Sequence, residues 1–238
     1  MLSPALRHKL RHESNLAASK AAVTGQATGA MANSLHLQLI ALEQDIHRLR
    51  QCARIADRVE MKRTELLPKY RPYVTRYLDA GVVHRNELFA QLIIWAFDVG
   101  DFDTGIAWAL IAIEQHQPTP GNIKRDWATF VADTVLAWAE TQATNGHAVE
   151  PWFSRVFDLV RTKWRLNERV TAKWFRAAGL HLLRDSEGQP RPSAVNDRNV
   201  LEQADHWLAQ AEQYHGKVGV STLRHKIAMR LRALNPEQ

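Results

Sequence analysis

Cysteine is almost absent from this chain of 238 residues, because Cys52 is its one example. A single thiol excludes a disulfide framework and a zinc site built only of cysteines, and it fits a reducing compartment. The longest apolar runs, near 92–97 and 106–113, fall far short of the roughly 20 residues that a membrane-spanning helix needs. Residues 17–24 are too short and too weakly apolar for a signal-peptide core. These absences predict a soluble cytoplasmic protein with no membrane partner.

The sequence also lacks the short motifs of several enzyme classes. No Gly-x-x-x-x-Gly-Lys-Ser/Thr loop occurs, so we expect neither ATP hydrolysis nor a bound cofactor. The 11 histidines are scattered without ligand spacing, and no nucleophile elbow is visible. No run alternates β-branched and polar residues, so no strand is expected either.

Helical periodicity is what the chain has instead. After residue 66, helices are predicted over 70–80, 86–98, 101–113, 124–144, from near Pro151, over 168–184, 198–215 and 222–234. The segments around Asp98–Ile113 and Asn199–Leu234 loosely resemble tetratricopeptide-type hairpins. The predicted fold is therefore all-α, with a long N-terminal coiled-coil-forming helix followed by a bundle of helical hairpins.

The long helix is predicted from a narrow apolar seam that begins after Ser34, a good N-cap residue. Its members alternate spacings of four and three, which is the heptad pattern of coiled coils. They are Leu35, Leu39, Leu42, Ile46, Leu49, Ala53 and Ala56. Pro68 and Pro72 are expected to end the helix. The seam predicts self-association, and the alternative is that the helix folds back onto its own domain.

Charge is distributed in blocks rather than evenly. The net charge is +7 over residues 1–76, −7 over 77–150 and +6 over 151–184, and it is balanced over 185–238. We predict a mobile basic arm (1–33), the long oligomerising helix (34–66), a helical core (67–184) and a C-terminal loop and hairpin (185–238). Such blocks indicate separate surfaces for separate partners, although solvated helix faces would give the same counts.

Two basic features are candidate DNA contacts. The arm carries Arg7, Lys9, Arg11 and Lys20, whereas Arg165, Arg169, Lys173 and Arg176 recur at spacings that align them on one helical face. Phosphate contacts of this kind supply most non-specific affinity for DNA but carry no base specificity. For the helical stripe, a solvated face or a protein contact is the alternative.

An acidic cluster is the candidate catalytic feature. Asp98, Asp101 and Asp103 lie within six residues, and three carboxylates could bind Mg²⁺ as in two-metal nucleases. The alternative, which we favour, is that they cap a tight turn between two helices. No metal is therefore assigned.

One stretch of the chain resembles a known family. The order Lys-Arg-x-Glu-Leu-Leu-Pro at 62–68, a second proline at Pro72, and then Trp95, Asp98, Gly100 and Asp101 are similar to the GpM-type small terminase subunits of temperate tailed phages. This resemblance implies a DNA-packaging protein of the bacterial host cytoplasm that binds viral double-stranded DNA at the cohesive-end site. It also implies a large terminase subunit with the packaging ATPase as partner, and self-assembly, possibly into a ring.

Three functions remain open from the sequence. The first is a non-enzymatic small terminase subunit that recognises DNA and recruits or regulates the large subunit. The second is a Mg²⁺-dependent endonuclease subunit that uses Asp98, Asp101 and Asp103, since the family is often labelled endonuclease. The third is a helical protein–protein scaffold that never touches DNA.

Overall fold

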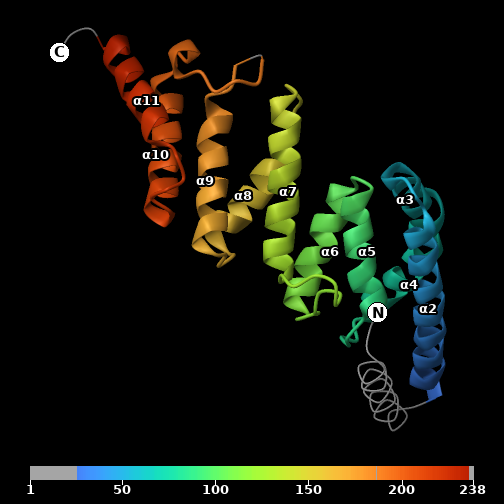
Figure 1. The fold of residues 1–238 in the computed structure, drawn as a ribbon. Coiled ribbons are helices and arrows are strands. Elements are labelled where there is room, and N and C mark those ends of the chain that lie inside the picture. The colour runs from blue at the N-terminus through green and yellow to red at the C-terminus, as the bar shows by residue number, and fades with distance from the viewer. Residues whose placement is uncertain (1–25, 186, 236–238) are drawn as a thin grey trace. The chain divides into compact units, whose positions relative to one another are not determined.

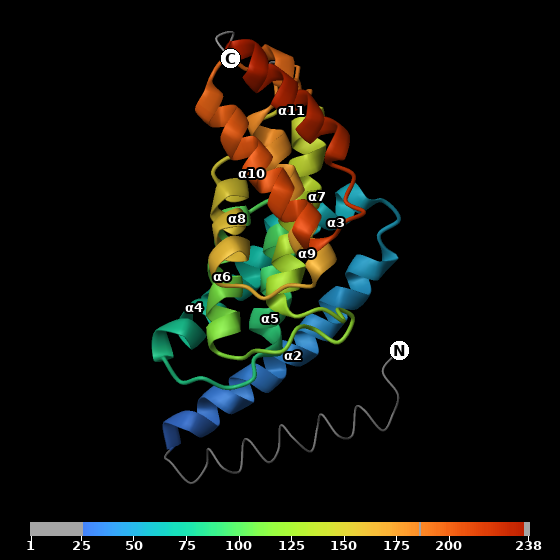
Figure 2. The same cartoon turned by 90° about the vertical axis from the view of Figure 1, so that its left-hand side faces the viewer.

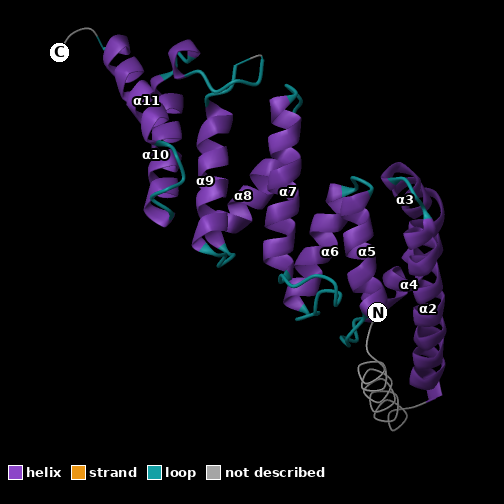
Figure 3. Cartoon of the chain, viewed as in Figure 1, coloured by secondary structure: helices purple, strands orange, loops and turns teal. Residues whose placement is uncertain are grey.

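The computed structural model describes residues 26–185 and 187–235, and all regular secondary structure within these ranges is helical (Figures 1 and 3). The all-α prediction is therefore confirmed for this part of the chain. Two compact units are present, residues 1–99 and 100–238. The division lies inside the segment 67–184 that was predicted to be one core, and the C-terminal hairpin belongs to the second unit. No helix in the described ranges is long and apolar enough to span a membrane.

The first unit is built around α5. Its elements are α2 (Gln26–Gln51), α3 (Ile55–Met61), the π-helical turn η1 (Lys62–Leu66), α4 (Leu67–Ala80) and α5 (Glu87–Asp98). Helix α5 is apolar almost all round and eight of its residues are buried, which explains why α2 and α4 both pack against it. Gly81 ends α4 in a left-handed conformation with φ 64°, at the predicted end of the helix over 70–80.

Helix α2 begins earlier than predicted. It starts at Gln26, so Ser34 is an interior residue rather than an N-cap, and part of the segment predicted as a mobile arm is helical. The residues before Ser34 include several alanines and a methionine, which are strong helix formers and extend the helix towards its N-terminus.

The predicted end of the long helix was also wrong. The helix stops at Gln51. Directly after it, the Cys52 carbonyl accepts a 2.9 Å hydrogen bond from the Arg58 guanidinium. The prolines do not end a helix. Pro68 lies in the first turn of α4, and Pro72 lies inside α4. Both prolines are exposed, so water can satisfy the carbonyls that lose an amide partner. The π-helical turn directly before Pro68 shifts the hydrogen-bond register there.

The second unit is a series of helices. These are α6 (Phe102–Glu114), α7 (Trp127–Thr144), α8 (Trp152–Thr162), α9 (Glu168–Leu182), the 3-10 turn η2 (Pro192–Ala194), α10 (Arg198–Tyr214) and α11 (Ser221–Leu234). Carboxylate or amide side chains cap four of them. Asp101, Asp126, Asn167 and Asp197 accept backbone N–H bonds at the starts of α6, α7, α9 and α10. The predicted boundaries are close to these because capping is a local property.

Helices α9 and α10 make the closest contact in the second unit. Gly179 permits it, because a Cβ atom there would lie 2.7 Å from the Leu208 side chain. On its other side, α9 buries Trp174, which stacks on Phe153 of α8 with ring centroids 5.2 Å apart. Figures 1 and 2 show α10 also lying beside α11. Helix α9 is thus fixed on two sides.

Candidate nucleic-acid interface

The strongest candidate surface is the exposed face of α9. Asn167 starts this helix by accepting a 3.0 Å hydrogen bond from the Arg169 amide, and Glu168 adds a favourable acid in the first turn. The apolar positions of α9 face α7, α8 and α10, whereas Arg169 and Lys173 are exposed. The sequence therefore places its basic residues on a helix whose orientation is fixed by packing.

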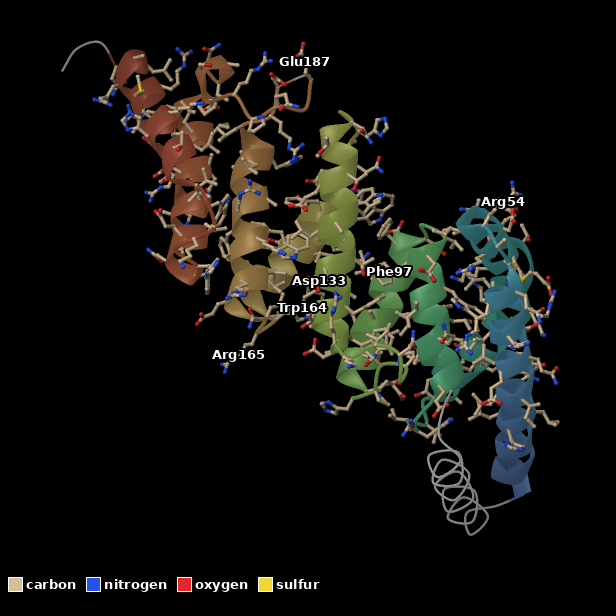
Figure 4. All side chains as sticks on the ribbon, in the orientation of Figure 1. Arg54, Phe97, Asp133, Trp164, Arg165 and Glu187 are labelled. Atoms are coloured by element: carbon tan, nitrogen blue, oxygen red, sulfur yellow. The ribbon has the colours of Figure 1, made fainter. Side chains whose placement is uncertain are left out.

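Three of the four residues of the predicted stripe lie on one helix, and the fourth lies outside it. Arg169, Lys173 and Arg176 lie on α9, whereas Arg165 lies in the loop before it, where its side chain points away from the helices (Figure 4). Arg165, Arg169 and Lys173 are exposed, and Arg176 is partly buried. No ion pair joins any of the four side chains to a carboxylate in the described ranges. The positive charge of the stripe is therefore uncompensated.

Most other arginines of the second unit have their charge compensated. Ion pairs join Arg125 to Asp133, Arg155 to Asp103, Arg161 to Asp158, Arg191 to Asp185 and Glu187, and Arg198 to Glu202. The stripe residues differ from these arginines in having no carboxylate partner. The sequence spacing could not show this difference. Lys and Arg side chains without a carboxylate partner can neutralise the phosphates of a nucleic-acid backbone.

Lys163 is a basic residue that the sequence reading missed. It ends α8, is exposed, and lies two residues before Arg165 with no carboxylate partner in the described part of the chain. It does not share the helical spacing of the stripe, because it precedes α9. Lys163 lies near the N-terminus of α9 because the loop between α8 and α9 is short.

The arm residues Arg7, Lys9, Arg11 and Lys20 lie outside the described residues. Their predicted role in DNA binding remains a prediction.

The acidic cluster is divided between the two units, and each carboxylate has its own contact. Asp98 accepts a 2.7 Å hydrogen bond from the Lys62 ammonium. Asp101 caps α6 by accepting from the Thr104 amide at 3.1 Å. Asp103 accepts from the Trp152 indole at 3.1 Å. No group of three or more His, Cys, Asp or Glu residues in the described ranges could hold a metal ion.

The two stretches that carry the family resemblance contact each other in the first unit. Besides the Lys62–Asp98 pair, the Arg63 guanidinium donates to the Val99 carbonyl at 3.1 Å. The Lys62 side chain is only 15% exposed, whereas the Asp98 side chain is 39% exposed, so water reaches the acidic member of the pair. Both basic residues come from the π-helical turn. These two contacts fix the end of α5 against that turn.

The heptad seam of α2 faces its own unit. Leu42 and Leu49 are buried, Leu35, Leu39 and Ile46 are partly buried, and Ala53 and Ala56 are exposed beyond the end of the helix. The face of α2 that stays open carries Leu37 and Ile40, which are 63% and 44% exposed. The alternative of folding back is thus observed for the seam, and self-association through it remains untested.

Asp45 is a buried charge on α2, next to the seam residue Ile46. Its carboxylate is 3% exposed and accepts hydrogen bonds from Lys69 at 2.7 Å, Tyr70 at 2.7 Å and Arg48 at 2.9 Å. Burial alone would raise the pKa of Asp45, but these donors outweigh it and hold the pKa below its ordinary value. Burial and the neighbouring carboxylate raise the pKa of Tyr70. This network joins α2 to α4.

Comparisons with known proteins agree on one family. The family model for the phage small terminase subunit matches residues 39–169. A protein of Haemophilus phage HP1 (strain HP1c1), named probable terminase, endonuclease subunit, is 37% identical over 195 residues, which cover 82% of this chain and 69% of that protein. The terminase, endonuclease subunit of Escherichia phage P2 is 26% identical over 186 residues, covering 76% of this chain and 72% of that protein. No solved structure matches the chain.

Proposed function

Because this chain belongs to the phage small terminase subunit family, we propose that it binds viral double-stranded DNA through its basic surfaces and presents that DNA to a large terminase subunit. The family membership supports a role in genome packaging in the cytoplasm of the bacterial host. The observation that carries the DNA-binding role is the uncompensated stripe of Arg165, Arg169, Lys173 and Arg176.

Electrostatics distinguishes a DNA surface from a solvated face. Each phosphate contact that a cation makes releases counterions, so the logarithm of the binding constant falls linearly with the logarithm of salt concentration. For duplex DNA the slope is about −0.9 per contact. A solvated arginine that never meets a phosphate adds nothing to this slope.

The test compares two double variants with the wild type on the same linear duplex. Arg169→Gln with Lys173→Gln removes two charges of the stripe, whereas Arg191→Gln with Arg198→Gln removes two charges that are already ion-paired. Fluorescence anisotropy across a series of KCl concentrations gives the slopes. We expect the first variant to lose about 1.8 from the magnitude of the slope and the control much less.

The arm contributes to the same function in our proposal. Removing residues 1–25 deletes Arg7, Lys9, Arg11 and Lys20 and leaves α2 complete. The truncated protein should bind the duplex with a shallower salt dependence. An unchanged slope would assign DNA binding to the helical surface alone.

We also propose that the protein self-associates through the open face of α2 rather than through its seam. Leu37 and Ile40 are the large apolar residues exposed there. Leu37→Ser with Ile40→Ser should dissociate the oligomer and leave helical content unchanged. Light scattering coupled to size exclusion reports the mass, and a strict monomer of the wild type at tens of micromolar would end this part of the proposal.

A second candidate function is the endonuclease named for both relatives. The observation in its favour is that the fold brings Lys62 to Asp98, a lysine–carboxylate pair that the local sequence around Asp98 lacks. Incubating the purified protein with its phage DNA and Mg²⁺ tests it. Cleavage that is lost in Asp98→Asn and Asp101→Asn, with CD spectra unchanged, would establish this function.

A further inference from the structure

Helix α11 differs in composition from the other helices. It contains Arg224, His225, Lys226, Arg230 and Arg232, and it has no acidic residue. Among the helices of the described ranges that carry lysine or arginine, each of the others has at least one Asp or Glu. Any compensating charge for α11 must therefore come from its neighbours.

The inner side of α11 is occupied by packing on α10. Ile227 is fully buried, and Leu223 and Leu231 are partly buried against the same apolar cluster, which includes Leu201 and Leu208. This stripe fixes which side of the helix faces outward. Figure 1 shows α10 on one side of α11 within the unit.

Among the described residues, neighbouring carboxylates compensate one of the four Lys and Arg charges of α11. Arg224 contacts Asp205 of α10 at 2.9 and 3.2 Å and Glu212 at 2.7 Å. Arg230 is bound by neutral groups, the Val195 carbonyl and the Asn196 side chain. The acidic residues of α10 that face α11 are thus both used by Arg224.

The remaining cations point outward without a carboxylate. Lys226 and Arg232 are exposed on α11, and Lys217 is exposed in the connection before it. None forms an ion pair with a described residue, and the Arg232 guanidinium contacts only the Ala228 carbonyl of its own helix. Thr222 and His225 complete the exposed side. Over the eleven residues from 222 to 232 this face extends about 15 Å.

We propose that this outer face of α11, together with Lys217, is a second surface for the phosphates of double-stranded DNA. The proposal rests on the DNA-binding function proposed above and assigns to it a site beyond α9. It also lies outside the part of the chain that the family model matches, residues 39–169. A duplex presents one phosphate for about every 1.7 Å of its axis, so a face of this length meets several.

Duplex DNA fits this surface better than an acidic protein does. The centre of a protein interface is normally apolar and rich in large side chains. Met229, 55% exposed, is the one large apolar residue exposed on α11. The rest of the face consists of cations, hydroxyls and alanines. Such a surface offers charge and close approach but little apolar area.

The experiment measures salt-dependent binding of a linear duplex by fluorescence anisotropy, with the full chain throughout. Lys217→Gln, Lys226→Gln and Arg232→Gln together remove the three outward charges. The matched control removes three ion-paired charges, with Arg125→Gln, Arg191→Gln and Arg198→Gln. We expect the α11 variant to lose up to about 2.7 from the magnitude of the salt slope and the control to lose much less. Adding Arg169→Gln and Lys173→Gln should reduce the slope further.

The outcomes separate this inference from the function on which it rests. A wild-type slope in the α11 variant, with a reduced slope in the α9 variant, overturns the second surface and leaves the DNA-binding function intact. Loss of binding to polyglutamate without any change for DNA assigns the face to an acidic protein and also overturns the proposal. If the wild type binds no duplex at low salt, the proposed function itself fails. Should CD show that the triple variant is misfolded, Lys226→Gln alone should still lower the slope by about 0.9.

Discussion

The buried carboxylate of Asp45 offers the sharpest test of how the first unit is stabilised. Asp45→Asn keeps the shape of the side chain but removes its charge and replaces one acceptor oxygen by an amide donor. Lys69 and Tyr70 donate to Oδ2 and Arg48 donates to Oδ1, so either placement of the new NH₂ group faces a donor. The variant therefore converts a satisfied network into one with a donor-to-donor contact.

The size of the effect follows from which partners can reach water. Breaking a buried ion pair by removing one member costs about 3–5 kcal/mol when the other member stays buried. Here Lys69 is 42% exposed and can be rehydrated. Tyr70 is fully buried and loses its acceptor when the new NH₂ group replaces Oδ2, and in the other placement that NH₂ group faces the Arg48 guanidinium. An unsatisfied buried hydroxyl costs about 1–3 kcal/mol. We expect Asp45→Asn to lower the free energy of unfolding of the first unit by about 2–3 kcal/mol at pH 7.

The assay must report on the first unit alone. Trp95 is the one tryptophan in residues 1–99 and lies 6.2 Å from the Tyr70 ring, between centroids. Incorporating 5-fluorotryptophan gives it a separate ¹⁹F resonance, which Trp95→Phe assigns, and urea titration of that resonance gives the unfolding free energy. Glu43→Gln, an exposed residue on the same helix without an ion-pair partner in the described part of the chain, is the control.

The pH dependence checks the cause. The folded pKa of Asp45 is lowered relative to the ordinary value near 3.9, so its contribution is fully present above about pH 4–5 and is lost as the pH falls through the folded pKa. The difference between wild type and Asp45→Asn should therefore shrink below pH 4. A variant within 0.5 kcal/mol of wild type at pH 7, or a difference that persists unchanged at pH 2–3, would refute the reasoning.

The remaining predictions concern packing in the second unit. Gly179→Ala should lower the unfolding free energy by about 1–2 kcal/mol in urea titration, since the clash with Leu208 exceeds the gain in helix propensity, whereas Gly121→Ala meets open space and should be nearly neutral. Gly188→Ala should lower the melting temperature more than Gly146→Ala does, because both glycines have φ above 70° but only at Gly188 would the Cβ clash with a backbone oxygen, that of Ala143; equal decreases would contradict this. Leu208→Ala should cost about 2–5 kcal/mol because the side chain is fully buried, and a cost below 1 kcal/mol would show that the α9–α10 contact is loosely packed.

The helices after residue 67 were predictable because their signals are local. Asn167 begins α9 and Gly81 ends α4, and in each case a single side chain or a left-handed backbone conformation determines the boundary. The prolines misled the prediction for the opposite reason. Their cost depends on whether a neighbouring turn and solvent can satisfy the freed carbonyls, and that is decided by the surroundings of Pro68 and Pro72.

The candidate surfaces were only half predictable. The spacing from Arg165 to Arg176 placed the stripe on one face, but spacing cannot tell a cation that is paired across the fold from one that is not. Arg224 and Lys226 lie two residues apart on α11, yet the first is bound by two carboxylates of α10 and the second by none. This difference arises between helices, so no local pattern records it.

By itself the sequence determined the helical class, most of the caps and the order of residues that assigns the family. The tertiary structure alone decided that the α2 seam turns inward onto its own unit, that Lys62 meets Asp98, and which basic residues keep their charge uncompensated. The physical reason is the distance along the chain over which each interaction acts. Helix propensity, capping and periodicity act over a few residues, whereas burial and ion pairing depend on segments that only folding brings together.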